Sequence, residues 1–408
     1  MRLLIISADV PPTRSAEAAH ALHLGQHLAR HGLDVHILTS ARGEVLPLDG
    51  VRVHPIMRTW SWAGLPRFRS FLNQCQPDAV LLMYLGAMYG HDPMMTFAAT
   101  LSKRLFPTVP FVTQFEHPYY QTPPLWTRAL RKGVAKWLTG EGTNYYYGTL
   151  LRDSDRVIVL SGTHGETLTA EFPDVQKKIV LIPPAPIMTM VQGEKDELRK
   201  RGRALLGVED DEFLLVYYGY LYPAKGVETL LQALSRLNGT LRRVRLVIIG
   251  GEVQHRVDVR INDQSTEYSR GLRSLADRLG LASKIIWTGT CPPERGEGSL
   301  YLQAGDACIL PFNSGVFLNN SSFSAAIAHG LPVVTTRGLS LEQPFKDGDN
   351  VLLVEPRNAD ELAKAIARLV EDRGLYARLR RGAEALAGEW FSWERAAERT
   401  LSTIHGTA

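Results

Sequence analysis

The stretch with the clearest potential for chemistry runs from Leu310 to Thr336, LPFNSGVFLNNSSFSAAIAHGLPVVTT. Its pattern predicts the end of a buried strand, a loop, a short helix capped by Ser321 or Ser322, a turn at Gly330 and a second strand. Such a unit places a helix N-terminus at the carboxyl end of a strand, where unpaired N–H groups and partial positive charge can hold phosphate. Four neutral donors surround that position: Asn319, Asn320, Ser321 and Ser322. The alternative is an ordinary crossover unit of an α/β domain.

A lysine in a second loop offers the positive charge that a phosphate attracts. Lys225 lies in Pro223-Ala224-Lys225-Gly226, directly before a predicted leucine-rich helix, and Gly226 permits close approach of the backbone to a ligand. From this local pattern alone, a surface lysine in a loop is the more common interpretation.

Length and composition limit the class of protein. The chain has 408 residues, enough for two domains, and its composition is typical of a soluble globular protein. A formal net charge of +4 argues against bulk nucleic-acid binding. The three cysteines form no CxxC pair, so they suit a reducing compartment and offer neither a disulfide framework nor a zinc site. The apolar N-terminal run is too short for a signal peptide, and no stretch is long and apolar enough for a transmembrane helix.

The hydrophobic pattern predicts two successive α/β series. Strands of the first series are expected at residues 3–6, 35–39, 51–53, 79–83, 110–113, 157–160 and 179–182, with a helix starting near residue 17. Strands of the second are expected at 214–218, 245–249, 284–288, 307–310, 332–335 and 351–354, followed by helices at 362–369, 375–386 and 393–404. This alternation predicts parallel sheets. A proline-rich break followed by a charged segment places the domain boundary near residue 190, and the absence of GxGxxG leaves a dinucleotide site without direct support.

Seven stretches match one family in order and spacing. They are DVPPTRSAEAAHALHLGQHLARHGLDVHILT, YYGYLYPAKGVETLLQAL, LVIIGGE, IIWTGT, AGDACILPF, AIAHGLPVVTT and DGDNVLLVEPRNADELAKAI. With them the chain resembles the GT-B glycosyltransferases of family 4 over nearly its whole length. The resemblance implies an α/β architecture of two Rossmann-like, doubly wound domains facing each other across a cleft. Residues 1–190, joined by the terminal helix 391–408, would bind the acceptor, and residues 191–390 would bind a nucleotide sugar.

The chemistry implied by the resemblance is transfer of a sugar from a nucleoside diphosphate sugar to an acceptor hydroxyl, with retention, as in hexosyltransferases. Negative charge grows on the departing diphosphate, so cations and N–H donors must stabilise it. In a front-face route the leaving phosphate accepts the acceptor's proton. Such a route needs neither a pair of catalytic carboxylates nor a metal, so we expect no cofactor and no metal.

The resemblance assigns the donor to loops of the second series. Lys225 matches the lysine that contacts the diphosphate, and Gly219 lies in the same loop. The polar run Asn319-Asn320-Ser321-Ser322 would bind the diphosphate as well. The nucleotide is assigned to residues that follow the next two strands: Gly250, Glu252, Thr290 and Cys291.

In the first series, two loops match the family's site. Arg14, Ser15 and Ala16 occupy the small-residue loop that faces the diphosphate, with Arg14 as a substitute cation. Glu116 and His117 follow a strand whose end often carries His-Glu near the transferred sugar, and we count both as catalytic candidates. The alternative is a loop pair with a solvated glutamate.

Three positions depart from the family pattern. Tyr220 stands where an arginine is usual, and Phe317 and Ala325 stand where the family has two glutamates. The loop Ser314-Gly315-Val316 resembles a branch that lacks this signature. The departures keep open a catalytically degenerate protein that binds a sugar nucleotide or serves as a scaffold. A nucleotide-sugar epimerase is another alternative. His329, at the expected helix end, is expected to be structural.

Two segments mix tryptophan with basic residues: Trp60–Arg69 and Trp126–Trp137. Such segments can rest at an anionic membrane surface, although a solvated amphipathic helix is the simpler interpretation. We therefore expect a cytoplasmic enzyme of glycan biosynthesis, with peripheral contact at the inner face of a membrane as an alternative. The acceptor would be a glycan, a lipid-linked molecule or a small molecule.

Overall fold

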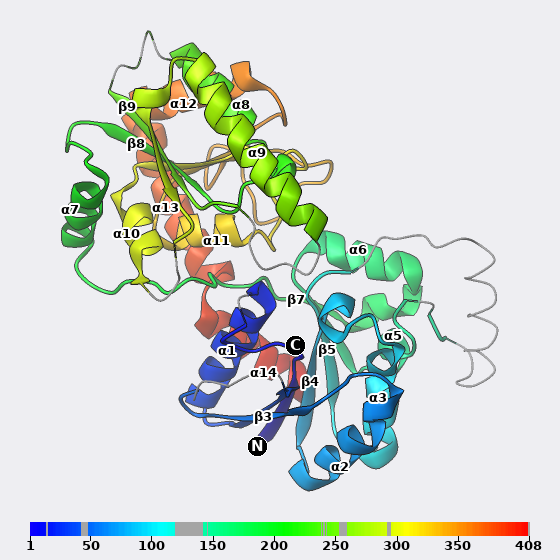
Figure 1. The fold of residues 1–408 in the computed structure, drawn as a ribbon. Helices are drawn as coiled ribbons and strands as arrows, with labels where there is room; N and C mark the ends of the chain where they lie inside the picture. Colours follow the sequence, from blue (N-terminus) through cyan, green and yellow to red (C-terminus); the bar gives the residue numbers. More distant parts are fainter. Residues whose placement is uncertain are drawn as a thin grey trace, which may run out of the picture. The chain divides into compact units, whose positions relative to one another are not determined.

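The computed structural model describes residues 1–13, 15–41, 48–118, 142–144, 146–237, 239, 241, 243–252, 259–291 and 295–406. The chain divides into two compact units. The N-terminal unit consists of Met1–Pro184 with Trp393–Ala408, and the C-terminal unit is Ala185–Ser392. Each unit is a sheet with helices packed on it (Figure 1).

The N-terminal unit is built on a seven-stranded sheet in the order β3-β2-β1-β4-β5-β6-β7, and its strands pair in parallel. The strands are β1 (Arg2–Ile6), β2 (Asp34–Ser40), β3 (Val51–Met57), β4 (Ala79–Tyr84), β5 (Phe111–Phe115), β6 (Arg156–Val159) and β7 (Ile179–Leu181). Its α-helices are α1 (Ala16–Arg30), α2 (Leu65–Cys75), α3 (Ala98–Leu105), α5 (Leu150–Asp153), α6 (Gly162–Glu171) and α14 (Trp393–His405). Short 3-10 turns are η1 (Trp62–Gly64), η2 (Gly86–Tyr89), η3 (Pro93–Phe97) and η4 (Pro173–Lys178). Strand order reverses between β1 and β4, the point where open α/β sheets bind ligands.

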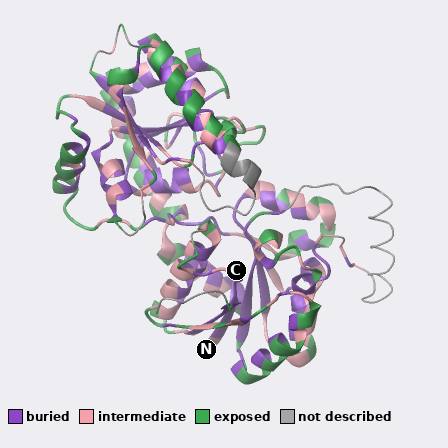
Figure 2. Ribbon diagram, viewed as in Figure 1, coloured by how far each residue is buried: buried purple, intermediate pink, exposed green. Residues whose placement is uncertain are grey.

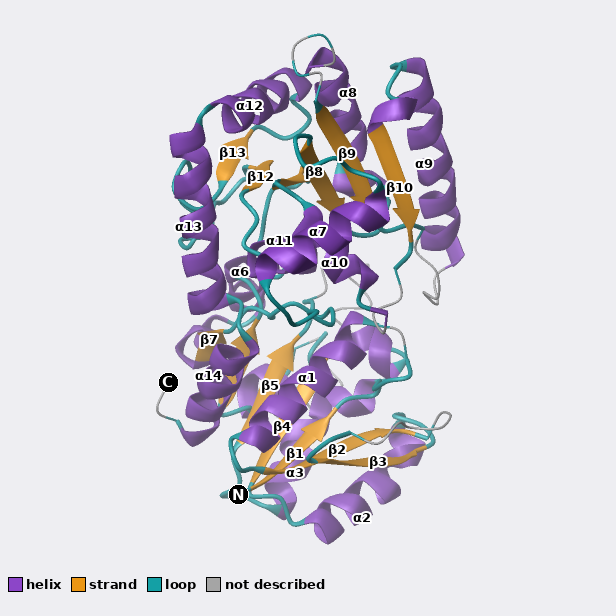
Figure 3. Ribbon diagram, turned by 90° about the vertical axis from the view of Figure 1, so that its left-hand side faces the viewer, coloured by secondary structure: helices purple, strands orange, loops and turns teal. Residues whose placement is uncertain are grey.

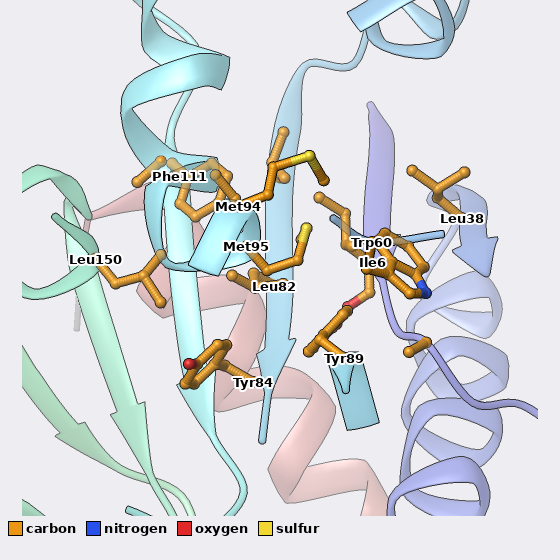
Figure 4. Packing of buried hydrophobic residues seen from close by; sticks show 14 of the residues in the cluster. Ile6, Leu38, Trp60, Leu82, Tyr84, Tyr89, Met94, Met95, Phe111 and Leu150 are labelled. Atoms are coloured by element: carbon orange, nitrogen blue, oxygen red, sulfur yellow. The ribbon is translucent and has the colours of Figure 1, made fainter. Parts of the chain in front are cut away.

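Both faces of the N-terminal sheet are buried, which explains the continuous apolar runs of its strands. On one face, Ile6 packs with Tyr89 and Phe111 in a cluster that also includes Met94 and Met95 (Figure 4). The other face packs against α1 and α14, through residues that include Leu3, Ile5, Leu24, Ala397 and Ile404. The C-terminal helix of the chain is therefore part of the core of the N-terminal unit.

The C-terminal unit is built on a six-stranded sheet in the order β10-β9-β8-β11-β12-β13, again parallel. The strands are β8 (Phe213–Tyr218), β9 (Val244–Ile249), β10 (Ile285–Gly289), β11 (Ala307–Leu310), β12 (Val333–Thr336) and β13 (Leu352–Val354). The helices are α7 (Lys195–Leu206), α8 (Val227–Leu237), α9 (Val259–Arg278), α10 (Glu297–Ala304), α11 (Ser321–Ala328), α12 (Ala359–Glu371) and α13 (Arg373–Trp390), with turns η5 (Pro223–Lys225) and η6 (Ala282–Lys284). Strand order reverses between β8 and β11. Figure 3 shows α12 and α13 beside the β13 edge of this sheet and α9 beside β10 at the other edge, and α8 packs against both α9 and α12.

The predicted architecture of two parallel α/β sheets is confirmed. Strands of both sheets are largely buried (Figure 2). The predicted cap of the helix at residue 359 is also confirmed, because Asn358 Oδ1 accepts a hydrogen bond from the N–H of Glu361 at 3.0 Å.

The predicted cap of α11 is wrong. The residue that precedes the helix is Asn320, not Ser321 or Ser322. Its side chain turns back into the loop, where Oδ1 accepts from the N–H of Phe317 at 2.7 Å, so it does not cap the helix either.

The first segment that mixes tryptophan with basic residues, Trp60–Arg69, has one tryptophan in the core and one at the surface. Trp60 is buried and donates to Ser40 Oγ at 2.8 Å, whereas Trp62 is 47% exposed. Trp60 therefore cannot rest on a membrane surface, because the core already holds it. The second segment, Trp126–Trp137, lies outside the described residues. Within the described part of the chain, no helix has the length and apolarity needed to cross a membrane.

Candidate functional site

Two loops of the C-terminal unit, after β8 and after β11, are joined at the point where strand order reverses. Asn313 donates from its backbone N–H to the carbonyl of Ala224 at 3.0 Å and from its side-chain amide to the carbonyl of Pro223 at 2.7 Å. Gly226 has φ +65°, and a Cβ there would lie 2.1 Å from the carbonyl oxygen of Pro311. Only glycine therefore fits where the two loops meet.

Lys225 lies in this junction with its ammonium over two aromatic rings. Its Nζ is 4.8 Å from the ring centroid of Phe312 and 5.3 Å from that of Tyr222. Among the residues that the structure describes, no carboxylate forms an ion pair with Lys225. A half-buried cation that carries no neutralising partner is suited to an anionic ligand.

The helix that follows Lys225 already has its first N–H group occupied. The N–H of Val227 donates to Tyr268 Oη at 3.1 Å, and Tyr268 donates in turn to Glu228. Burial, together with the hydrogen bond to Glu228, raises the pKa of Tyr268 far above its ordinary value, so its hydroxyl stays protonated. The positive group that this loop offers a ligand is therefore Lys225 itself.

Glycines bring the loops after β8, β9 and β10 into backbone contact. Gly250 has φ +130°, and a Cβ there would lie 2.2 Å from the carbonyl oxygen of Gly219. Its N–H donates to the carbonyl of Gly289 at 3.1 Å. The structure thus places the predicted nucleotide-binding residues at one edge of the sheet.

The side chains at this edge differ in exposure. Glu252 is half-buried and accepts from Thr266 Oγ1 at 3.0 Å, whereas Thr290 is exposed. Cys291 is half-buried, and burial raises the pKa of its thiol, which makes it a poor nucleophile.

The start of α11 packs against the same β8 loop. Ser322 is 3% exposed, and a Cβ on Gly219 would lie 2.6 Å from its hydroxyl oxygen. Asn319 and Ser321 are half-buried beside it, and Asn320 stabilises the loop as described above. Of the four predicted phosphate donors, Ser322 therefore lies next to Gly219, and the side chain of Asn320 is engaged within its own loop.

Sequence reasoning missed Glu342, which follows β12 and has no local motif. It is 9% exposed, and its Oε2 accepts from the N–H of Leu318 at 2.5 Å, directly beside Phe317. A carboxylate thus supports the loop at which the two-glutamate signature is absent, but it is directed at the backbone. Ala325 stands at the second position where a glutamate of the family pattern is missing, and its carbonyl accepts from His329 Nδ1 at 2.7 Å. Ser299 bonds the other nitrogen of His329, and burial lowers the pKa of this histidine to about 4, which agrees with a structural role.

In the N-terminal unit, Glu116 belongs to a closed network of buried side chains. Its Oε1 accepts from Gln114 Nε2 at 2.7 Å, and its Oε2 lies 3.1 Å from His20 Nδ1. The second nitrogen of His20 lies 3.4 Å from the same amide of Gln114. Because an amide N–H can only donate, this arrangement requires the His20 tautomer that carries its proton on Nδ1. Both oxygens of Glu116 are therefore occupied, by partners that sequence reasoning did not find.

His117, next to Glu116, is exposed, and its ring lies 5.3 Å from that of His164 at the start of α6. Burial, and secondarily the charge of His117, lowers the pKa of His164 to about 3. Ser15 is the N-cap of α1 and accepts from the N–H of Ala18 at 3.0 Å, while Ala16 is exposed. Arg14 lies outside the described residues.

Three histidines of α1 surround one tryptophan of α14. The rings of His20, His23 and His27 lie 5.4, 5.2 and 5.9 Å from that of Trp393. Burial lowers the pKa of His23 to about 4, so this histidine is neutral near pH 7. Their spacing of three and four residues marks one helix face, a signal present in the sequence. What it could not show is that the partner comes from the other end of the chain.

Within the described ranges, no group of three or more His, Cys, Asp or Glu side chains is placed to hold a metal ion.

Comparisons with known proteins identify the family. Residues 199–386 match the family model "Glycosyl transferases group 1", and residues 18–185 match "Glycosyltransferase Family 4". The D-inositol 3-phosphate glycosyltransferase of Acidothermus cellulolyticus is 33% identical over 252 residues, covering 61% of this chain and 52% of that protein. The one of Actinosynnema mirum is 27% identical over 270 residues, covering 62% and 58%. The chain thus spans about half the length of the curated relatives it matches.

Solved structures share the fold over the full chain. Sucrose-phosphate synthase of Thermosynechococcus elongatus matches with a TM-score of 0.68 at 19% identity, covering 100% of this chain and 98% of its own. HepE of Anabaena, in complex with UDP and glucose, matches with a TM-score of 0.67 at 15% identity, covering 100% of both chains. Two parallel α/β sheets with these neighbours define the GT-B class. The chain belongs to the group 1 glycosyltransferases of family 4, a retaining family that uses nucleotide-sugar donors, and the predicted resemblance is confirmed.

Proposed function

We propose that the protein transfers a sugar from a nucleoside diphosphate sugar to an acceptor hydroxyl, with retention, and that the C-terminal unit binds the donor. The observation that carries this proposal is the half-buried ammonium of Lys225, which lies where strand order reverses and has no carboxylate partner among the described residues. A catalytically degenerate protein would have no need to keep such a cation uncompensated, because an unpaired, partly buried charge lowers stability.

The diphosphate would bind to Lys225 and to the start of α11, next to Gly219. Charge that develops on the leaving phosphate is stabilised by this cation and by N–H donors, and the phosphate accepts the acceptor's proton. The nucleotide would lie against Gly250, Glu252, Thr290 and Cys291, beside the glycine-rich loop edge.

On the acceptor side, His117 is the better candidate for touching the sugar, because it is exposed at the end of β5. Glu116 has both oxygens occupied, so its contribution would be to hold His20 in one tautomer and orientation. The resemblance also assigns Arg14, Ser15 and Ala16, of the N-terminal unit, to contact with the diphosphate.

The relatives guide the choice of substrates. HepE was solved with UDP and with UDP-glucose, so uridine nucleotides are the first donors to test. The curated relatives are named for D-inositol 3-phosphate, which makes inositol phosphates the first acceptors. Glycan and lipid-linked acceptors follow, at a cytoplasmic location. Peripheral contact with the inner face of a membrane through Trp62, Arg67 and Arg69 remains the alternative.

The deciding experiment measures thermal stabilisation and hydrolysis across a panel of nucleotide sugars, with Lys225→Ala and Lys364→Ala side by side. Lys364 is an exposed lysine of α12 in the same unit and serves as the matched control. We expect one donor to stabilise and be hydrolysed slowly, with both effects lost only in Lys225→Ala.

Two other outcomes would change the assignment. If no donor binds, or if Lys225→Ala behaves like the control, the degenerate binding or scaffold protein takes precedence. If an altered nucleotide sugar is released without any acceptor, the protein is an epimerase.

A further inference from the structure

We propose that Tyr222 and Phe312 form an aromatic cradle that positions the ammonium of Lys225 while leaving its charge available to a diphosphate. This inference rests on the proposed function of the site. It assigns positioning roles to Tyr222 and Phe312.

The geometry of the cradle meets the requirement for cation–π attraction. The Lys225 Nζ lies 4.8 Å from the Phe312 centroid and 5.3 Å from the Tyr222 centroid, both inside the range of about 6 Å over which such pairs attract. Phe312 is 4% exposed, and Tyr222 and Lys225 are half-buried. Removal of water from around the rings strengthens the attraction relative to an exposed pair.

The Phe312 ring is held in place by the backbone on both sides of it. The backbone N–H of Phe312 donates to the carbonyl of Leu310 at 2.9 Å, and the carbonyl of Phe312 accepts from the hydroxyl of Thr336. The next residue, Asn313, binds the Lys225 loop through the two hydrogen bonds described above. The backbone that carries the ring is therefore tied to the Lys225 loop, and the burial of Phe312 leaves the ring little room to turn away.

An aromatic holder differs from a carboxylate in its effect on the ligand. A carboxylate would orient the ammonium but would also neutralise it and repel a diphosphate. The negative face of a ring orients the cation without adding a net charge. A lysine side chain has a flexible four-carbon stem, so a pre-set position reduces the freedom that binding would otherwise remove.

The first test needs no ligand. Lysines are labelled by reductive ¹³C-methylation, which keeps their positive charge, and the Lys225 signal is identified by its absence in Lys225→Arg. We expect this signal upfield of the other lysines because of ring currents, and expect it to move back in Phe312→Leu. A Lys225 signal at the position of exposed lysines overturns the cradle.

The second test is a double-mutant cycle on binding of the nucleoside diphosphate that binds the wild type best, starting with UDP. We expect Phe312→Leu to weaken binding about 3- to 10-fold when Lys225 is present, and to change it less than 2-fold in a Lys225→Met background. Equal losses in both backgrounds would show that Phe312 acts only through packing, and would overturn the proposal. The matching nucleoside, which lacks phosphates, should bind all four proteins equally.

The two tests separate failure of the cradle from failure of the site. If Lys225→Met binds the diphosphate like the wild type, the proposed role of the lysine fails, and the purpose of the cradle fails with it. If Lys225→Met loses binding but Phe312→Leu and Tyr222→Leu do not, only the cradle fails. Tyr222→Leu is included because Phe312 is buried and its replacement could impair folding, which circular dichroism would reveal.

Discussion

The two units share an architecture but treat their buried charge in opposite ways. In the N-terminal unit, both oxygens of Glu116 accept hydrogen bonds from buried side chains, His20 and Gln114, so this carboxylate is satisfied inside the protein. In the C-terminal unit, Lys225 rests on aromatic rings and has no carboxylate partner within the described residues. A carboxylate whose oxygens are both occupied by fixed donors holds the geometry of its neighbours, whereas a cation without a carboxylate partner is available to a ligand. The comparison therefore predicts that stability depends on the first and donor binding on the second.

The largest expected effect is at Gly226, where the loops of the C-terminal unit meet. Gly226→Ala places a Cβ 2.1 Å from the carbonyl oxygen of Pro311 at a residue with φ +65°. We expect a loss of about 2–3 kcal/mol in unfolding free energy, because both the contact and the conformation are strained, together with loss of nucleotide binding. Urea unfolding and binding titration measure the two effects.

Gly388→Ala is the matched control for that variant. Gly388 lies in α13 of the same unit, and a Cβ there meets nothing within 4 Å. This variant should be neutral or slightly more stable. If both alanines behave alike, the loop junction is not as tight as its geometry indicates.

In the N-terminal unit, Glu116→Ala tests the hydrogen-bonded carboxylate. It leaves buried N–H donors on His20 and Gln114 without this acceptor, so we expect a loss of about 2 kcal/mol in unfolding free energy. Nucleotide binding should change little, in contrast to Lys225→Ala. Glu166→Ala, at an exposed position on α6, is the control and should be neutral. Unchanged stability of Glu116→Ala would contradict the closed network.

Acid should destabilise the N-terminal unit more than the C-terminal unit. Burial lowers the pKa values of His23 and His164 to about 4 and about 3, and that of His329, in the C-terminal unit, to about 4. A folded-state pKa below the unfolded value means that stability is fully present above about pH 6.5 and is lost as pH falls toward the folded pKa.

Denaturant unfolding at pH 7 and pH 5 measures this difference. When the pH falls from 7 to 5, protonation of each of these histidines should lower the unfolding free energy by about 1–2 kcal/mol. We expect His164→Gln to reduce the pH dependence in the N-terminal unit and His329→Gln to reduce it in the C-terminal unit. Variants that keep the full dependence of the wild type would show that other groups cause it.

The smallest expected effect lies away from both charges. Asn358→Ala removes the cap of α12, where Oδ1 accepts from the N–H of Glu361, and should lower the unfolding free energy by about 1 kcal/mol. Nucleotide binding should not change. Asn358→Asp keeps an acceptor oxygen and should restore stability. A binding defect in Asn358→Ala would mean that nucleotide binding is sensitive to any loss of stability. The different effects expected at Glu116 and Lys225 could then not be assigned to their different environments.

The sequence by itself determined where the strands lie, that they form parallel sheets, and to which family the chain belongs. Strands buried on both faces require continuous apolar runs, such as Leu3–Ile6 and Leu214–Tyr217, and these are readable without a structure. The candidate loops were also readable, because glycine, proline and polar residues end such runs in recognisable ways.

Only the tertiary structure decided which of these side chains are exposed or free to contact a ligand, and which are held by other parts of the protein. It buried Trp60 but exposed Trp62, turned Asn320 back into its loop, placed His20 beside Glu116 and put Phe312 beneath Lys225. The partners in the last two pairs are far apart in the chain and come from different elements. Local patterns specify elements and their buried faces, whereas contacts of this kind depend on how loops meet once the sheet has assembled. That is why a sequence can predict a phosphate site and still not reveal which charge in it is left free.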